Sequence, residues 1–366
     1  MDRIRSSLAK NKVYLLSLIL SVAAALVIGA VLMAVTGFDP ADGYGAMIKG
    51  ALGSPRVFGN TITKMITLCL TGLAMTIGAK AGMFNVGGEG QLFLGGLAAT
   101  MTGIGLQGAS PLIAVPLAFL SAAAAGGIYA LIPAVLKVKL KVSEVITTIM
   151  LNSVAIYVCS YLVNSNGPLA TDDFGVLGGS DAVPDGFMFA QIVPRSNLST
   201  ALIYSAAIAF LCWYVMKKTT IGLEMKVTGD NERFAFFAGL PKDKIMIWSM
   251  VMSGVICGLA GMFEVYGYQA RFQSSISNEF YYDGMLVAMI MRYQPLGIIL
   301  MSLFFGVLKV GATAMEGDVG ISSELILIVQ SIIIFFMAAE QGIMNSILAR
   351  RARKRAALTL EKEAGA

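Results

Sequence analysis

Long apolar runs recur along this chain and constrain its fold more than any other feature. A helix needs about 20 apolar residues to cross the roughly 30 Å hydrocarbon core, because every backbone N–H and C=O there must find a partner within the protein. Only 13% of the residues are charged and the mean hydropathy is +0.76, whereas soluble domains carry about a quarter charged residues. The sequence therefore predicts an all-α, polytopic membrane protein. The predicted spans lie near 13–35, 57–79, 84–104, 111–136, 143–163, 198–216, 245–268 and 321–340.

The basic residues gather in short clusters between the apolar runs, which is the pattern of cytoplasmic loops. The first run follows such a cluster and, at about 22 apolar residues, is interpreted as a retained anchor rather than a signal peptide. The loop at 164–198 carries four aspartates against one arginine and is predicted to be extracytoplasmic. We expect a single transmembrane domain over 1–349 and a basic cytoplasmic tail at 350–366, with both termini cytoplasmic. The basic clusters are Arg3–Lys12, Lys137–Lys141, 217–244 and Arg350–Arg355.

Residues 282–314 do not fit a single span. Because both termini are predicted to be cytoplasmic, the number of crossings is even and this stretch is expected to turn back. One helix of this length would reach about 50 Å, which exceeds the hydrocarbon core, and Met291–Pro295 interrupts it. The sequence predicts a short half-helix, a break and a longer return helix, giving about ten transmembrane segments.

Several classes of chemistry are excluded by what the sequence lacks. It contains no histidine, which excludes HExxH zinc sites and Ser-His-Asp triads. The four cysteines stand singly in apolar runs and are interpreted as packing groups. No GxxxxGK[ST] phosphate loop occurs, so any ATP must be hydrolysed by another chain. We expect no catalytic residue, cofactor or metal, and, because the basic residues form no continuous face, no nucleic-acid partner.

Polar residues concentrate in two segments at predicted membrane depth, 81–91 and 283–295. Such groups are costly in lipid and normally face a cavity or a partner. Interrupted segments in the two halves of a chain indicate the binding site of a transporter. The alternative is that both segments are interfacial turns whose charged side chains reach the lipid headgroups. The candidate ligand-binding residues are Asn85, Glu89 and Gln91 in the first segment and Asp283, Arg292 and Gln294 in the second.

The segment 217–244 is the longest polar stretch between predicted spans on the cytoplasmic side. Asp230 or Asn231 is expected to cap a short helix that ends at Gly239, before Pro241. Exposed Phe234 and Phe237 suit either docking into the groove of a soluble partner or a position flat on the membrane surface. The pattern leaves both interpretations open.

Small residues recur at close spacing in two apolar runs. Gly254, Gly258 and Gly261 lie in one, and Gly78 and Gly82 in another. Small residues in membrane helices let two backbones approach closely. We expect these glycines to act in helix packing rather than in binding.

Three motifs together resemble one family. They are Phe84-Asn85-Val86-Gly87-Gly88-Glu89-Gly90-Gln91; Gly229-Asp230-Asn231-Glu232-Arg233 with Ala238-Gly239, Ser253-Gly254 and Gly258-Leu259-Ala260-Gly261; and Asp283-Gly284 with Pro295-Leu296-Gly297. With this order and spacing the chain resembles the permease subunits of ABC importers in the ribose and branched-chain amino acid superfamily. The most similar branch is that of the nucleoside and simple-sugar permeases that accompany basic-membrane-protein lipoproteins. The run Met291–Pro295 departs from a Gly-Arg-Asn-Asn-Pro-like sequence that is common there.

The resemblance implies a translocation subunit in the bacterial plasma membrane that imports nucleosides, with simple sugars such as ribose or galactose as the alternative. Its implied partners are a cytoplasmic ABC ATPase, a second permease that is identical or related, an extracytoplasmic substrate-binding lipoprotein and membrane lipid. Asn85 and Gln91 would pair with base edges or ribose hydroxyls, and aromatic side chains would stack on the base. The implied substrate-binding residues are Phe84, Asn85, Glu89, Gln91, Tyr281, Asp283, Arg292 and Gln294. The implied ATPase-coupling residues are Gly229, Asp230, Asn231, Arg233, Phe234, Phe237 and Gly239.

Two other classes of function were weighed against this interpretation. A secondary transporter driven by an ion gradient needs carboxylates within the membrane to bind the coupling ion, and Glu89, Glu264, Asp283 and Glu324 are candidates. An intramembrane enzyme using paired carboxylates is disfavoured, because no two aspartates stand at mid-span in a paired arrangement.

Overall fold

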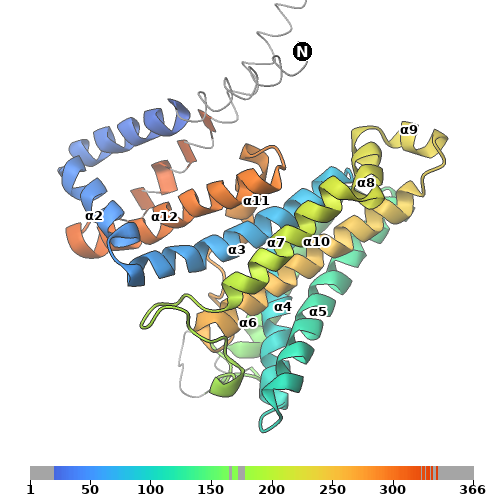
Figure 1. The fold of residues 1–366 in the computed structure, drawn as a ribbon, viewed down its shortest axis with the longest axis horizontal. Helices are drawn as coiled ribbons and strands as arrows, with labels where there is room; N and C mark the ends of the chain where they lie inside the picture. The colour runs from blue at the N-terminus through green and yellow to red at the C-terminus, as the bar shows by residue number, and fades with distance from the viewer. Residues whose placement is uncertain are drawn as a thin grey trace, which may run out of the picture. The chain divides into compact units, whose positions relative to one another are not determined.

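The computed structural model describes residues 20–164, 167–171 and 178–322, together with 324–325, 327–329, 331–332 and 335–336 (Figure 1). In this described part the regular structure is helical and the β pairing consists of two isolated bridges, which confirms the all-α prediction. The α-helices are α2 (Pro40–Leu52), α3 (Pro55–Lys80), α4 (Gly88–Gly105), α5 (Pro111–Leu140), α6 (Glu144–Val163), α7 (Ala201–Lys218), α8 (Thr220–Asp230), α9 (Glu232–Phe237), α10 (Lys242–Glu264), α11 (Phe280–Ile290) and α12 (Pro295–Val319). A 3-10 turn, η2 (Asp185–Phe187), and a π-helical turn, η3 (Val265–Gln269), complete the elements.

Among the described helices, six are long and apolar enough to cross a membrane: α3, α5, α6, α7, α10 with η3, and α12. Two shorter apolar helices span Leu20–Val35 and Phe280–Ile290. The predicted spans 13–35 and 321–340 fall partly outside the described residues, and the tail 350–366 falls wholly outside them. The count of about ten segments and the cytoplasmic termini therefore stay predictions.

The chain forms two compact units. One comprises Ala51–Val310, and the other joins the segment up to Gly50 with the segment from Gly311 onward. Within the second unit, Tyr44 Oη donates to the Leu26 carbonyl at 2.6 Å. That hydrogen bond ties α2 to the apolar helix that precedes it.

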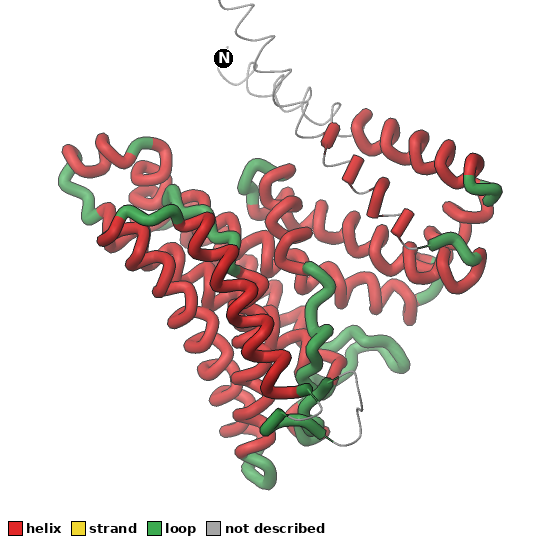
Figure 2. The backbone as a smooth tube through the Cα atoms, turned by 180° about the vertical axis from the view of Figure 1, so that it is seen from behind, coloured by secondary structure: helices red, strands yellow, loops and turns green. Residues whose placement is uncertain are grey.

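The centre of the unit Ala51–Val310 is a close packing of α4, α5 and α10. Figure 2 shows from behind the long helices of this unit running alongside one another. A Cβ atom added at Gly126 of α5 would lie 3.0 Å from the Cα of Gly258, and one added at Gly261 would lie 2.8 Å from the Gly96 nitrogen. The helix backbones therefore meet without intervening side chains. This confirms the packing role predicted for Gly258 and Gly261.

The stretch 282–314 contains the predicted break. α11 ends at Ile290 and α12 begins at Pro295. Between them Arg292 and Tyr293 have φ values of 52° and 57°. Residues other than glycine rarely adopt this left-handed conformation, which ends the helix. Proline then starts the next helix, because its missing N–H costs nothing in the first turn.

The glycine contacts generate a prediction about stability. Gly258→Ala is expected to lower the free energy of unfolding by about 1–3 kcal/mol, because the added methyl group overlaps the Ala122 carbonyl and pushes α5 away from α10. Gly105→Ala is the matched control, since a Cβ there has no atom within 4 Å and alanine favours the helix. Unfolding of both variants in bicelles provides the measurement. Equal stability of the two variants would contradict the close-packing interpretation.

Candidate functional site

Asn85 lies at the centre of a fully buried polar group that we call the amide node, formed by Asn85, Gln91, Ser253, Asn152 and Tyr281. The Asn85 Nδ2 donates to Gln91 Oε1 and to Ser253 Oγ, both at 2.9 Å. Its Oδ1 accepts from the Gly87 nitrogen at 2.9 Å and from Gln91 Nε2 at 3.3 Å. The carboxamide thus uses both donor hydrogens and both acceptor positions. It fixes the turn between α3 and α4 to α10.

Asn152 of α6 and Tyr281 of α11 complete the node. Asn152 accepts from the Gly90 nitrogen at 2.8 Å and donates to the Val86 carbonyl at 2.7 Å. The Tyr281 hydroxyl donates to the Asn85 carbonyl. Four segments that are distant in sequence therefore meet at one buried hydrogen-bonded group.

Gly88 and Gly90, on either side of Glu89, lie where neighbouring helices leave no room for a side chain. A Cβ at Gly88 would overlap the ring of Tyr281, and one at Gly90 would lie 3.1 Å from the Cα of Asn152. Glu89 itself is buried and accepts from the Tyr281 backbone nitrogen at 3.0 Å. These glycines let α6 and α11 approach the start of α4.

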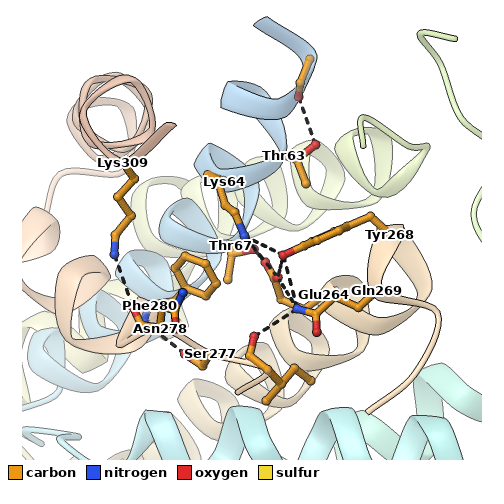
Figure 3. Close-up of polar contacts among 12 residues, drawn as sticks. Thr63, Lys64, Thr67, Glu264, Tyr268, Gln269, Ser277, Asn278, Phe280 and Lys309 are labelled. Carbon is orange, nitrogen blue, oxygen red and sulfur yellow. Dashed lines mark hydrogen bonds and ion pairs between the residues drawn. The ribbon is translucent and has the colours of Figure 1, made fainter. Parts of the chain in front are cut away.

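A second polar group, the charged cluster, consists of Lys64, Glu264, Tyr268, Gln269, Asp283 and Lys309. Figure 3 labels each of these residues except Asp283. Glu264 is 1% exposed and accepts from the Thr67 hydroxyl, from Tyr268 Oη at 2.8 Å and from Gln269 Nε2 at 3.1 Å. The Lys64 Nζ lies 3.9 Å from the same carboxylate and donates to Tyr268 Oη at 2.6 Å. A buried carboxylate is stable only when it is paired and hydrogen-bonded in this way.

The π-helical turn η3 positions two members of this cluster. Its five residues, Val265–Gln269, are followed by Ala270, which has a φ of 59°. The wider turn brings both Tyr268 and Gln269 back to Glu264. Single π turns inside helices occur frequently at functional sites. The loop after residue 178 supports the turn, since the Val183 nitrogen donates to the Ala270 carbonyl at 2.7 Å and the Phe189 nitrogen donates to the Tyr266 carbonyl at 2.9 Å.

Lys309 of α12 forms the other half of the cluster. Its Nζ lies 2.6 Å from Asp283 Oδ2 and donates to the Asn278 carbonyl at 3.3 Å. The ring of Phe280 separates the two cations, with its centroid 4.6 Å from Lys64 Nζ and 5.3 Å from Lys309 Nζ. Both lysines belong to helices that are able to cross a membrane. At 1.5 Å per residue, Lys64 lies about 14 Å from the start of α3 and Lys309 about 21 Å from the start of α12.

The remaining predicted binding residues are not members of these two groups. Phe84 is half-buried beside the amide node, whereas Arg292 and Gln294 are exposed on the turn between α11 and α12. The Lys217 Nζ donates to Gln294 Oε1 at 3.2 Å. The structure therefore brings Asn85, Glu89, Gln91 and Tyr281 together, places Asp283 in the charged cluster, and separates Arg292 and Gln294 from both.

The predicted coupling segment forms two short helices, α8 and α9. The Asn231 side chain accepts from the Phe234 nitrogen at 2.9 Å and caps α9, as expected, and Gly239 follows the helix with a φ of 76°. Phe234 is 60% exposed and Phe237 85% exposed. A hollow of about 780 Å³ lies beside α9, lined by Lys137, Lys141, Arg233, Phe236, Phe237 and Lys242 among others.

Two further contacts hold this segment in place. The Lys242 Nζ donates to Glu232 Oε1 at 2.5 Å and holds the pKa of that carboxyl below its usual range. At the other end, a Cβ added at Gly229 would lie 2.9 Å from the Gly82 nitrogen. Gly229 and Gly82 thus allow α8 to contact the turn that leads to Asn85.

Sequence reasoning missed Lys64, Tyr268, Gln269 and Lys309 as site residues, and Asn152 as a member of the node. Lys64 and Lys309 are isolated cations inside apolar runs, and Asn152 is an amide inside another. Their signal was the cost of a polar group at membrane depth.

Taken together, the six long apolar helices among the described residues and the polar groups enclosed by them define a multi-pass α-helical membrane protein. The chain belongs to the family described as branched-chain amino acid transport system permease component, which matches residues 57–338.

Named relatives cover most of this chain. The guanosine ABC transporter permease protein NupP of Bacillus subtilis is 33% identical over 337 residues, which are 92% of this chain and 96% of that protein. The nucleoside ABC transporter permease protein NupB of Lactococcus lactis is 32% identical and covers 86% of this chain and 87% of its own length. The glucose ABC transporter permease protein TsgB13 of Haloferax volcanii is 31% identical, and the match covers 88% of this chain and 87% of that protein.

The amide node generates a prediction about stability. Ser253→Ala is expected to lower the free energy of unfolding by about 1–3 kcal/mol, because it leaves one hydrogen of the buried Asn85 Nδ2 without its acceptor. Ser302→Ala is the matched control, since the Ser302 Oγ is buried and has no partner within the described residues. Unfolding in bicelles compares the two variants. A loss of stability as large in Ser302→Ala as in Ser253→Ala would contradict the assigned role of the node.

Proposed function

We propose that this chain is the transmembrane subunit of an ABC importer that carries nucleosides into a bacterial cell across the plasma membrane. The observation that carries the proposal is the 33% identity with a guanosine permease over nearly the full length of both chains. A second relative whose name specifies nucleosides, at 32% identity, supports it.

Simple sugars are the second candidate substrates. The glucose permease of Haloferax volcanii has an identity of 31%, close to that of the nucleoside permeases. A nucleoside and a hexose share an uncharged ring that carries neighbouring hydroxyl groups. One site could therefore serve either substrate with changes in only the residues that contact the base.

The proposed topology has about ten transmembrane segments in one domain over 1–349, with both termini in the cytoplasm. The loop 164–198 would face outward and receive substrate from an extracytoplasmic binding lipoprotein. The segment 217–244 would face the cytoplasm, and a second permease, identical or related, would complete the pathway. Surrounding lipid would cover the exposed apolar faces of the spans.

The proposed ATPase partner would dock on α9. Exposed Phe234 and Phe237 and the adjacent hollow offer an apolar, partly basic surface, and aromatic side chains are typical anchors of protein interfaces. The chain itself has no phosphate-binding loop for ATP. Docking on a soluble ATPase is therefore favoured over a helix that lies flat on lipid.

The ion-coupled alternative loses support from the contacts of the carboxylates. Glu264 and Asp283 each lie beside a lysine, and Glu89 accepts a backbone hydrogen bond. A carboxylate that binds a transported cation needs oxygen positions open to that ion. These three carboxylates are instead engaged by groups of the protein.

We propose different roles for the predicted binding residues. Asn85 has committed all of its hydrogen-bonding positions inside the amide node, so direct contact with a nucleoside would require the node to open. Positioning of α4 against α10 is the role that the closed node supports. Uptake that stays unchanged in a well-expressed Asn85→Ala variant would exclude both roles.

Uptake measurements test the proposed substrate. Cells that lack this chain are expected to lose uptake of radiolabelled guanosine, adenosine or uridine and to recover it when the chain is restored, while uptake of ribose and glucose is unchanged. Loss and recovery of ribose or glucose uptake alone would instead establish the sugar alternative. Unchanged uptake of all five compounds would contradict the importer proposal.

The docking surface generates a separate prediction. Phe237→Ala is expected to reduce nucleoside uptake about tenfold or more and to reduce the amount of ATPase that copurifies, because an exposed aromatic anchor is removed. Leu112→Ala is the matched control: Leu112 is 86% exposed in the first turn of α5, and this change should affect neither readout. Both variants must reach wild-type levels in the membrane. Normal copurification of the ATPase with Phe237→Ala would refute docking through α9.

A further inference from the structure

The side chains of both lysines of the charged cluster are partly exposed, and both lysines belong to helices long and apolar enough to cross a membrane. The Lys64 side chain is 26% exposed and that of Lys309 18% exposed, while Glu264 beneath them is buried. An ammonium group that faces hydrocarbon is energetically costly, so intramembrane lysines face a water-filled path or a protein partner. The exposed side of the cluster is therefore expected to face water or protein rather than lipid tails.

The charges of the cluster balance. Two lysines stand beside two carboxylates, each lysine with its own partner. The carboxylate of Glu264 is buried and accepts from three side-chain donors, whereas the two lysine side chains are partly exposed. A ligand on the exposed side would meet hydrogen-bond donors in a region without net charge.

Lys64 has unused hydrogen-bonding capacity. An ammonium group has three hydrogens, and within the described part of the chain Lys64 makes one hydrogen bond, to Tyr268 Oη. Gln269 and Tyr268 are half-buried beside it, on the same π-helical turn. Donors and acceptors thus alternate over a short distance, which suits hydroxyl groups, because each hydroxyl both donates and accepts.

We infer that Lys64, Tyr268, Gln269 and Lys309 form a subsite for an uncharged ring with neighbouring hydroxyl groups. The inference rests on the proposed import function and deepens it: the ring is the ribose of a nucleoside or, if the substrate is a sugar, the hexose itself. Glu264 and Asp283 are positioning residues that hold the ammonium groups and cancel their charge. A phosphorylated substrate would lose its hydration at this subsite, and no net positive charge there would compensate for the loss. The subsite should therefore disfavour it.

The test compares guanosine with 2′-deoxyguanosine, which lacks one of the neighbouring hydroxyls, in cells that contain the complete transporter. Lys64→Met is expected to reduce the wild-type preference for guanosine about tenfold, because one hydrogen bond from a charged donor is lost. Lys49→Met, a change to an exposed lysine of α2 outside the cluster, should keep the preference. A merely structural role for Lys64 would lower uptake of both compounds equally, and that outcome overturns the inference.

A second variant tests the charge balance. Glu264→Gln leaves one positive charge uncompensated, so guanosine monophosphate is expected to compete about tenfold better against guanosine uptake than it does in wild type. Unchanged competition in a variant that reaches the membrane overturns the role given to Glu264. If Glu264→Gln fails to accumulate, the pair Lys64→Met with Glu264→Gln removes both charges, and it should accumulate and show the same lost preference as Lys64→Met.

Failure of the nucleoside proposal and failure of the subsite give different results. A wild-type protein that imports glucose and not guanosine refutes the nucleoside proposal alone, and the same variants are then compared with glucose and 2-deoxyglucose. Loss of the preference for glucose in Lys64→Met would support the subsite, and an unchanged preference would overturn it.

Discussion

The requirement that every polar group inside the bilayer be satisfied by the protein governs this structure. Asn85, Asn152 and Glu264 stand in otherwise apolar surroundings, and each has at least two side-chain or backbone partners. Some of these partners lie in the same segment, such as Gln91 for Asn85 and Tyr268 for Glu264. Others, such as Ser253 for Asn85 and Thr67 for Glu264, come from distant helices. The polar residues therefore decide which helices meet, and the apolar residues fill the space between them.

The amide node and the charged cluster differ in their exposure, and this difference indicates different roles. The amide node is closed: its members are buried, and Asn85 has no unused donor or acceptor. The charged cluster keeps its carboxylate buried but leaves Lys64 and Lys309 partly accessible. A closed group contributes rigidity, while an accessible one is able to bind. Both groups depend on α11, whose Tyr281 joins the node and whose Asp283 joins the cluster.

Local features of the fold could be predicted from the sequence, and long-range ones could not. The helical runs, the break at Met291–Pro295 and the Asn231 cap depend on residues within a few positions of one another. The partners of Asn85 and Lys64 depend on contacts with residues such as Ser253 and Glu264, more than 160 positions away in sequence. No local pattern encodes those contacts. The π-helical turn had no signal either, since Val265–Gln269 continues the apolar character of α10.

The contacts around Gly229 connect the exposed helix α9 with the interior. α9 follows α8 directly, and the close approach of Gly229 to Gly82 leaves no room for a side chain between α8 and the turn after α3. That turn contains Asn85, whose hydrogen bonds hold α10 through Ser253. A close-packed contact of this kind is bistable rather than continuously deformable. A small shift of one helix is therefore transmitted to the segment it contacts. A displacement of α8 must therefore either break the Gly229 contact or move the segment that holds the amide node together.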